Sequence, residues 1–204
     1  EYPFSAAQRF CRNKRSLGIG LTNFAAWLAT QGFNHESKES IKLTNDLMEE
    51  IQYGLLSASC EEAEKTGPAK DFDASRYSEG WLPIDFHSTL PEDIQFEYNM
   101  DWEELRSRIK SFGLANCTLT AIMPAEASSI CQNSTNGIEP IRSFLTEKLS
   151  KNGSKKVLIP NYPKYKKNYV IAWDMKSNTN SIKIAAAMQK FIDMGMSFNT
   201  YLNY

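Results

Sequence analysis

The residues from Asn116 to Pro140 have the types and spacing best suited to chemistry in this chain. A short apolar and β-branched stretch from Cys117 to Met123 leads through Pro124 into small residues at 125–129, which could open a helix. A strand that feeds a helix in this way presents unpaired backbone N–H groups and the positive end of the helix dipole. Phosphate groups bind at such positions. The residues predicted to form this phosphate site are Ala125, Glu126, Ala127 and Ser128.

The same stretch also fits an ordinary helix start without a ligand, and the residues alone support both interpretations equally. One helix terminus favours an anion by about 0.3–1 kcal/mol, or by up to about 2 kcal/mol when partly buried. Glu126 would occupy the first turn, where a carboxylate is typically exposed and favoured by the dipole. The polar loop from Asn133 to Pro140 is expected near the proposed pocket, and its alternative is a plain turn.

Cysteine and histidine spacing predicts neither a metal site nor a histidine-based catalytic pair. The only histidines, His35 and His87, are far apart in sequence, and the four cysteines show no C-x-x-C spacing. Cysteines that are scattered in this way, in a chain without a secretory signal, are expected to be reduced thiols in the cytoplasm. These cysteines are Cys11, Cys60, Cys117 and Cys131, and Cys117 is interpreted as a small core residue.

Periodic apolar residues predict the helices around this stretch. The strongest signals are an N-cap acid at Asp101 with Glu104 three residues later, and a stop at Gly113. A long apolar stripe ends at Gly67 and Pro68. Apolar residues are also closely spaced from Phe24 to Leu28, as is typical of a helix. The remaining predicted helices cover residues 5–14, 37–65 and 181–193.

Extended segments are expected at Leu17–Leu21 and at Cys117–Met123, the second of them covered on both faces. Asn152 and Gly153 lie between two strand-like runs, 143–149 and 155–159, which is a strong hairpin signal. Residues 161–167 are interpreted as a surface turn. Strands that alternate with helices over much of the length indicate an α/β fold.

Composition places the chain among ordinary globular proteins and excludes several classes. It has 204 residues, of which 42% are apolar and 23% charged, with a net charge of −1. We therefore expect no nucleic-acid partner, because the basic surface that such proteins need is missing. No apolar run approaches the roughly 20 residues that a membrane helix requires.

Several motifs in the same order resemble the large, catalytic chain of class I ribonucleotide reductase. The run from Met123 to Pro140 is similar to that family's "MP-x-x-x-S-S … N-x-T-N-G-I-E-P" stretch. Other segments of this chain that look like family segments are Arg15–Phe24, Gly80–Asp85, Tyr98–Arg106 and Met188–Asp193. The resemblance therefore covers nearly the whole chain.

This resemblance implies that residues 1–204 are the C-terminal portion of a ten-stranded α/β barrel, incomplete and without a separate second domain. The implied activity is reduction of ribonucleoside diphosphates to deoxyribonucleotides for DNA synthesis, by a radical mechanism. In the family the loop equivalent to 125–128 holds the substrate diphosphate. This chain has alanine at 125 and 127, where the family often has a hydroxyl, so backbone N–H groups, Ser128 and Ser129 remain as donors.

The resemblance assigns no catalytic residue to this chain. The family's catalytic cysteines and glutamate lie in earlier segments, and its radical-relaying tyrosine pair lies further downstream than Tyr204. Tyr201 and Tyr204 do not match that pair, and none of the four cysteines matches the catalytic motifs. Effector sites for ATP and allosteric control likewise belong to other segments, and the segment alone is expected to be inactive. It is also expected to be poorly soluble, because an incomplete barrel leaves strand edges unpaired and apolar faces bare.

The implied partners are a ribonucleoside diphosphate, the rest of the large subunit, a second large subunit and a small subunit. The metal-containing small subunit would generate the radical, and thioredoxin or glutaredoxin would supply reducing equivalents, so this segment itself binds no cofactor. The alternative from another functional class is a non-catalytic nucleotide- or phosphate-binding module, or an assembly partner. Both alternatives predict anion binding at residues 125–128.

Overall fold

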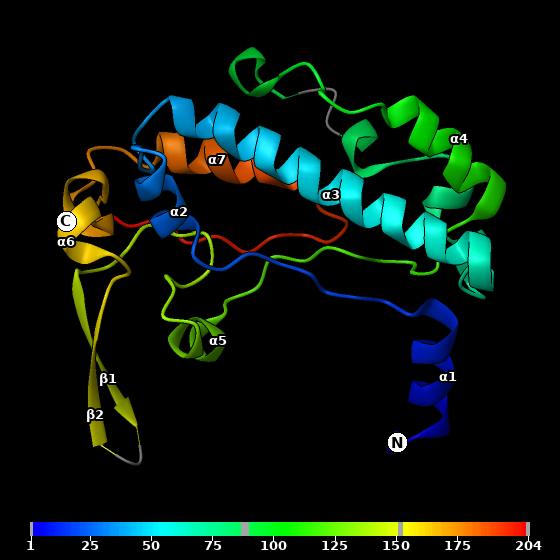
Figure 1. Ribbon diagram of the computed structural model, residues 1–204, viewed down its shortest axis with the longest axis horizontal. Helices are drawn as coiled ribbons and strands as arrows, with labels where there is room; N and C mark the ends of the chain where they lie inside the picture. Colours follow the sequence, from blue (N-terminus) through cyan, green and yellow to red (C-terminus); the bar gives the residue numbers. More distant parts are fainter. Residues whose placement is uncertain (1, 87–89, 151–152, 203–204) are drawn as a thin grey trace. The chain divides into compact units, whose positions relative to one another are not determined.

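The computed structural model describes residues 2–86, 90–150 and 153–202, and it combines helices with one two-stranded sheet (Figure 1). The chain divides into two compact units, which are described separately below. Unit 1 consists of residues 1–19, 45–121 and 188–195, and unit 2 of residues 20–44, 122–187 and 196–204. None of the helices in the described residues is long and apolar enough to cross a membrane.

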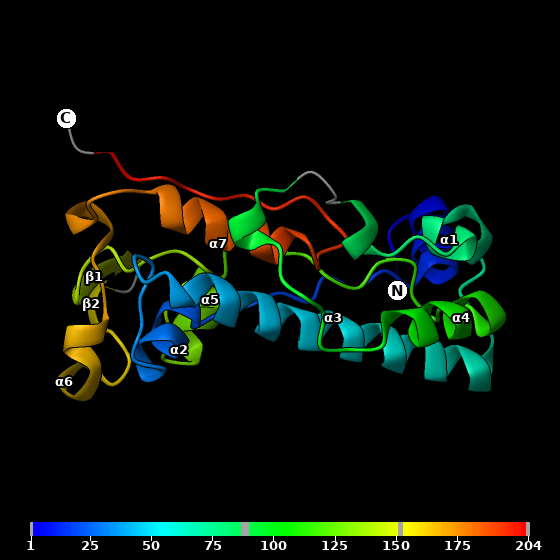
Figure 2. The ribbon, with the colours of Figure 1, turned by 90° about the horizontal axis from the view of Figure 1, so that it is seen from above.

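Unit 1 is built mainly from helices, and the sequence predicted their positions well. It contains α1 (Ser5–Lys14), most of α3 (Glu39–Thr66) and α4 (Trp102–Phe112). Its shorter 3-10 helices are η1 (Phe72–Ala74), η2 (Arg76–Glu79), η3 (Pro83–Phe86) and η4 (Glu92–Ile94). α4 lies beside the C-terminal part of α3 (Figures 1 and 2), where Arg108 forms an ion pair of 3.0 Å with Glu64.

Both ends of α4 are capped as predicted. The Asp101 carboxylate accepts a hydrogen bond of 2.9 Å from the Glu104 amide. At the other end Gly113 has φ +77°, a conformation that side chains with a Cβ rarely adopt. A Cβ at this position would also lie 2.7 Å from Cβ of Pro68. Glycine is therefore required at 113 both by the backbone conformation and by the space available.

A buried carboxylate ties the segment before α4 to α3. Glu49 has no exposed surface, and it accepts hydrogen bonds from the amides of Asn99 (2.7 Å) and Met100 (3.0 Å) and from Nε1 of Trp102 (3.1 Å). Lys190 is also buried, and its Nζ donates to Oδ1 of Asn45 at 2.7 Å. Each buried charge thus has hydrogen-bonding partners, as burial requires.

The predicted strand from Cys117 to Met123 is wrong as a regular strand. Only an isolated parallel bridge joins Ile19 and Thr120, although Leu17 also donates its amide to the Thr118 carbonyl at 2.9 Å. The carboxylate of Asp193 accepts the amides of Leu119 (2.6 Å) and Thr120 (3.0 Å). Because these two amides donate to the Asp193 side chain, they are not available to the carbonyls of a neighbouring strand, and the hydrogen bonds between residues 17–19 and 118–121 do not extend into a regular sheet.

Unit 2 contains the helices and strands that surround the candidate site. They are α2 (Phe24–Thr30), α5 (Glu126–Cys131), β1 (Leu145–Ser150), β2 (Gly153–Leu158), α6 (Tyr162–Tyr165), η5 (Lys166–Asn168), η6 (Ala172–Asp174) and most of α7 (Thr179–Gln189). One buried cluster joins α2 to the segments around the hairpin, and its members are Ala25, Ala26, Ala29, Ile141, Ile159 and Tyr169.

The predicted hairpin is confirmed, with β1 and β2 antiparallel and Leu145 opposite Leu158. Residues 151–152 of its turn lie outside the described residues. The surface turn predicted at 161–167 is instead the short helix α6 followed by η5. Pro163 explains this difference, because proline in the first turn of a helix lacks only an N–H that would be unpaired there anyway.

Candidate functional site

The predicted phosphate site lies at the start of α5. Ala125 is the N-cap residue, with φ −123° and ψ 46°, and its side chain has no oxygen that could cap the helix. The first helical hydrogen bond runs from the Ser129 amide to the Ala125 carbonyl, at 2.8 Å. Across the described part of the chain, the amides of Glu126, Ala127 and Ser128 have no hydrogen-bond acceptor. Three consecutive N–H groups at this helix start are thus open to a ligand.

Two other donors near this helix start are already paired within the chain. The amide of Ala125 donates to Oδ1 of Asn136 at 2.9 Å. The Ser129 hydroxyl donates to the carbonyl of Glu126 at 2.9 Å, and Ser129 is only 2% exposed. Ser128, in contrast, is exposed. Of the phosphate donors expected from the sequence, the amides of 126–128 and the hydroxyl of Ser128 therefore remain available to a ligand.

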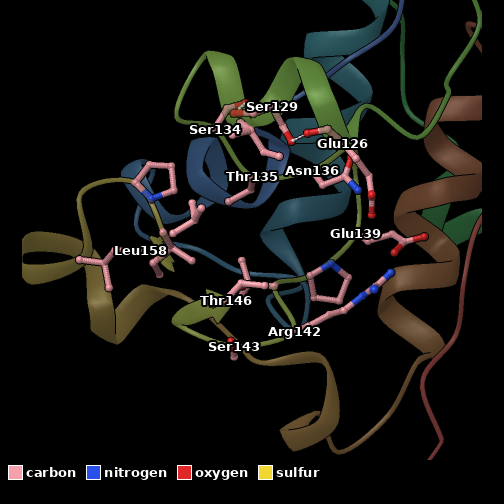
Figure 3. A pocket seen from close by; sticks show the side chains of 16 residues that line it. Glu126, Ser129, Ser134, Thr135, Asn136, Glu139, Arg142, Ser143, Thr146 and Leu158 are labelled. Atoms are coloured by element: carbon pink, nitrogen blue, oxygen red, sulfur yellow. Dashed lines mark hydrogen bonds between the residues drawn. The ribbon is translucent and has the colours of Figure 1, made fainter. Parts of the chain in front are cut away.

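A cavity of about 140 Å³ adjoins α5 (Figure 3). Its walls come from α5, from the segment between residues 134 and 146, and from the end of β2 with the two residues that follow. Of the four predicted site residues, only Glu126 lines it. Polar side chains on its walls include Ser134, Asn136, Glu139 and Arg142, and aliphatic side chains complete them. The cavity therefore combines one cation with two carboxylates and several neutral hydrogen-bonding groups.

A hydrogen-bonded group of side chains holds Glu139 and Arg142 at this cavity. The hydroxyl of Tyr201 donates to Oε2 of Glu139 at 2.6 Å, and Nε of Arg142 donates to that hydroxyl at 3.4 Å. Nδ2 of Asn199 donates to Oε1 of Glu139 at 2.6 Å. Burial, together with the hydrogen bond to Glu139, raises the pKa of Tyr201, so this tyrosine remains a neutral donor. No sequence motif indicates this role for Tyr201.

Comparison with known proteins decides the family. The family described as "Ribonucleotide reductase, barrel domain" matches residues 1–204. The chain belongs to this ribonucleotide reductase family. Similar relatives include the "Ribonucleoside-diphosphate reductase subunit alpha" of Buchnera aphidicola subsp. Acyrthosiphon pisum (43% identical), the "Ribonucleoside-diphosphate reductase 1 subunit alpha" of Salmonella typhimurium (42%) and the subunit alpha of Enterobacteria phage T4 (39%).

Each of these three alignments covers 98% of this chain and 26% of the relative. The chain thus spans about a quarter of the length of the curated relatives that it matches. The resemblance noted in the sequence is confirmed at the level of the family, and the chain matches a segment of the large subunit.

In this reductase segment the loop before Glu139 is anchored to the start of α2. Asn23, with φ +68°, donates its amide to the Thr135 carbonyl (2.8 Å) and accepts the Thr135 amide on its side-chain oxygen (3.1 Å). The amide of Phe24 donates to the carbonyl of Gly137 at 3.4 Å. The sequence predicts a polar loop at 133–140, and in the structure Asn23 and Phe24 form hydrogen bonds to its residues Thr135 and Gly137.

His35 is a further anchor of the loop at residues 133–140, and no motif in the sequence indicates this role. It is 2% exposed, and its Nε2 lies 2.8 Å from the carbonyl of Ile138. Because a carbonyl can only accept, Nε2 carries the proton. Burial lowers the pKa of His35 to about 4, so the imidazole is neutral at physiological pH.

The four cysteines of the reductase segment are free thiols, of which Cys11 and Cys131 are exposed and Cys60 is buried. Cys117 is partly buried, and burial raises the pKa of its thiol. A raised thiol pKa lowers the thiolate fraction and hence the reactivity. Cys117 therefore has the character of a packing residue rather than that of a nucleophile.

Proposed function

We propose that this chain is a C-terminal portion of the catalytic barrel of a class I ribonucleoside-diphosphate reductase large subunit, and that it holds the substrate diphosphate. The observation that carries the proposal is the row of three unpaired amides at residues 126–128. Family membership over residues 1–204 supports the same assignment. The complete subunit would form the ten-stranded α/β barrel as one domain, to which this segment contributes part of the wall.

The proposed diphosphate site consists of Ala125, Glu126, Ala127 and Ser128. The amides of 126–128 would donate to phosphate oxygens, whereas Ala125 would shape the turn, because its own amide is paired with Asn136. A hydrogen bond to a charged group contributes about 1.5–3 kcal/mol. Ala125 and Ala127 have no hydroxyl to donate, so the backbone and Ser128 would bind the phosphates.

Reduction of the ribose would depend on groups supplied by the complete assembly. We propose that the remaining part of the large subunit provides the catalytic thiols, and that a metal-containing small subunit provides the radical. Thioredoxin or glutaredoxin would return the oxidised thiols to the reduced state. A second large subunit and allosteric effector sites for ATP complete the proposed assembly, which would operate in the cytoplasm. The role of this segment would be binding and orientation of the substrate.

A charge substitution at Ala127 tests this assignment. Ala127 is exposed, so Ala127→Glu and its neutral control Ala127→Gln are both accommodated without repacking. Two like charges about 5 Å apart at an effective dielectric of about 20 repel by about 3 kcal/mol. We therefore expect Ala127→Glu to raise KM for a ribonucleoside diphosphate at least about tenfold, and Ala127→Gln to have little effect.

The assay uses the complete large chain with its small subunit and a dithiol reductant, and it measures deoxynucleotide product. If the wild-type mixture formed no deoxynucleotide, the enzymatic function would be refuted, and a phosphate-binding module would remain. If Ala127→Glu and Ala127→Gln had equal KM values, the location of the diphosphate would be refuted instead.

A further inference from the structure

Resting on the proposed function, we infer that Asn136 is a positioning residue for the diphosphate loop. Its side chain would hold the turn before α5 in the conformation that aims the amides of 126–128 at the phosphates. The hydrogen bond that carries the inference joins Oδ1 of Asn136 to the amide of Ala125 at 2.9 Å.

The start of α5 needs an external support because it lacks the usual local one. Helices commonly begin with Ser, Thr, Asp or Asn, whose side-chain oxygen caps the first turn. Here the N-cap residue is Ala125, with a backbone outside the helical region at φ −123° and ψ 46°. An amide left unpaired in this partly buried turn would cost about 1–3 kcal/mol. The oxygen of Asn136, eleven residues further along the chain, accepts the amide of Ala125 itself and so holds this turn, whereas the amides that a cap side chain would bind stay unpaired.

Asn136 itself has a fixed position, because its neighbours on both sides are anchored. Thr135 exchanges two hydrogen bonds with Asn23, and the carbonyl of Gly137 accepts the amide of Phe24. Both anchors belong to the start of α2, a helix with mostly buried residues. The position of the Asn136 side chain, which accepts the Ala125 amide, is therefore fixed by the start of α2 and not by the turn before α5.

This arrangement links α2 to the proposed phosphate donors through a single side chain. The turn at Ala125 sets the direction of the following helical amides, because φ and ψ at this residue orient the peptide plane that carries the Glu126 N–H group, from which the helix continues. Loss of the Asn136 oxygen would free the turn to rotate and would misdirect the donors at 126–128. Asn136 would act without touching the reacting atoms, so the effect is expected on substrate binding and not on the chemical step.

The test compares Asn136→Ala with Asn168→Ala in the complete large chain. Asn168 is a matched control, because its Nδ2 forms one hydrogen bond of 2.8 Å to a backbone carbonyl, that of Ala29, in the same unit. We expect Asn136→Ala to raise KM for a ribonucleoside diphosphate about tenfold with kcat within twofold of wild type. Asn168→Ala is expected to leave KM unchanged.

Three results would overturn the inference. If Asn136→Ala left KM unchanged while Ala127→Glu raised it, the positioning role would fail and the proposed function would stand. If Asn136→Ala and Asn168→Ala raised KM equally, the effect would be general destabilisation. If neither Asn136→Ala nor Ala127→Glu changed KM, the diphosphate site itself would be refuted.

Hydrogen exchange on the wild-type protein provides a test that needs no variant. The paired amide of Ala125 is expected to exchange more slowly than those of Ala127 and Ser128. Addition of a ribonucleoside diphosphate is expected to slow exchange at Ala127 and Ser128. Equal exchange rates at Ala125 and Ala127 in the free protein would show that the Asn136 bond is absent, and would overturn the inference.

Discussion

The buried imidazole of His35 makes the stability of unit 2 depend on pH in a way that can be calculated. Its pKa is lowered from 6.5 to about 4, and its Nε2 donates to the Ile138 carbonyl. Between pH 6.5 and pH 4, His35 is mostly protonated in the unfolded chain but mostly neutral in the folded chain. The contribution of His35 is therefore fully present above pH 6.5 and is lost as pH falls toward 4. One pKa unit corresponds to about 1.4 kcal/mol, so the full loss is about 3 kcal/mol.

The variant His35→Gln isolates this effect, because its amide can still donate to the carbonyl of Ile138 but does not titrate. Hydrogen exchange at the amides of α2, corrected for the intrinsic rate at each pH, gives the free energy of opening of this unit. Between pH 7 and pH 5 the wild type should lose about 2 kcal/mol more of this free energy than the variant. A parallel pH dependence of the two proteins would show instead that His35 titrates normally in the folded state.

Two further substitutions test the packing of the units. The hydroxyl of Thr135 is buried and, within the described residues, has no hydrogen-bond partner, so Thr135→Val should raise the free energy of opening by about 1 kcal/mol, measured by hydrogen exchange. A loss of stability would mean that the hydroxyl is paired in solution. Gly113→Ala should destabilise unit 1 by at least about 1–2 kcal/mol, because φ is +77° and the new Cβ would meet Pro68. A melting temperature equal to that of the wild type would contradict this account of the α4 end.

Local signals predicted most of the helices and the hairpin. Asp101, Glu104 and Gly113 each act within one or two turns of α4, so their roles can be inferred from spacing alone. The pair Asn152–Gly153 likewise indicates a turn from residues adjacent in sequence. The strand at 117–123 was wrong for a non-local reason, since the carboxylate that takes its amides belongs to Asp193, more than seventy residues away.

The candidate site shows the same division between local and non-local determinants. Pro124 and the small residues after it indicated where α5 begins, and the structure places its start at Glu126. The sequence could not reveal that Asn136 pairs with the amide of Ala125, because no local pattern specifies which polar residue of a loop folds back. The hydrogen bond of His35 was also hidden, since its partner, the carbonyl of Ile138, lies about a hundred residues later in the chain.

We propose that the amides at the start of α5 bind the diphosphate of a ribonucleotide. The most direct measurement is an experimental structure of the complete large chain with a bound ribonucleoside diphosphate. We expect phosphate oxygens about 2.7–3.2 Å from the amide nitrogens of Ala127 and Ser128. Phosphates bound elsewhere in the subunit, with these amides contacting only water, would contradict it.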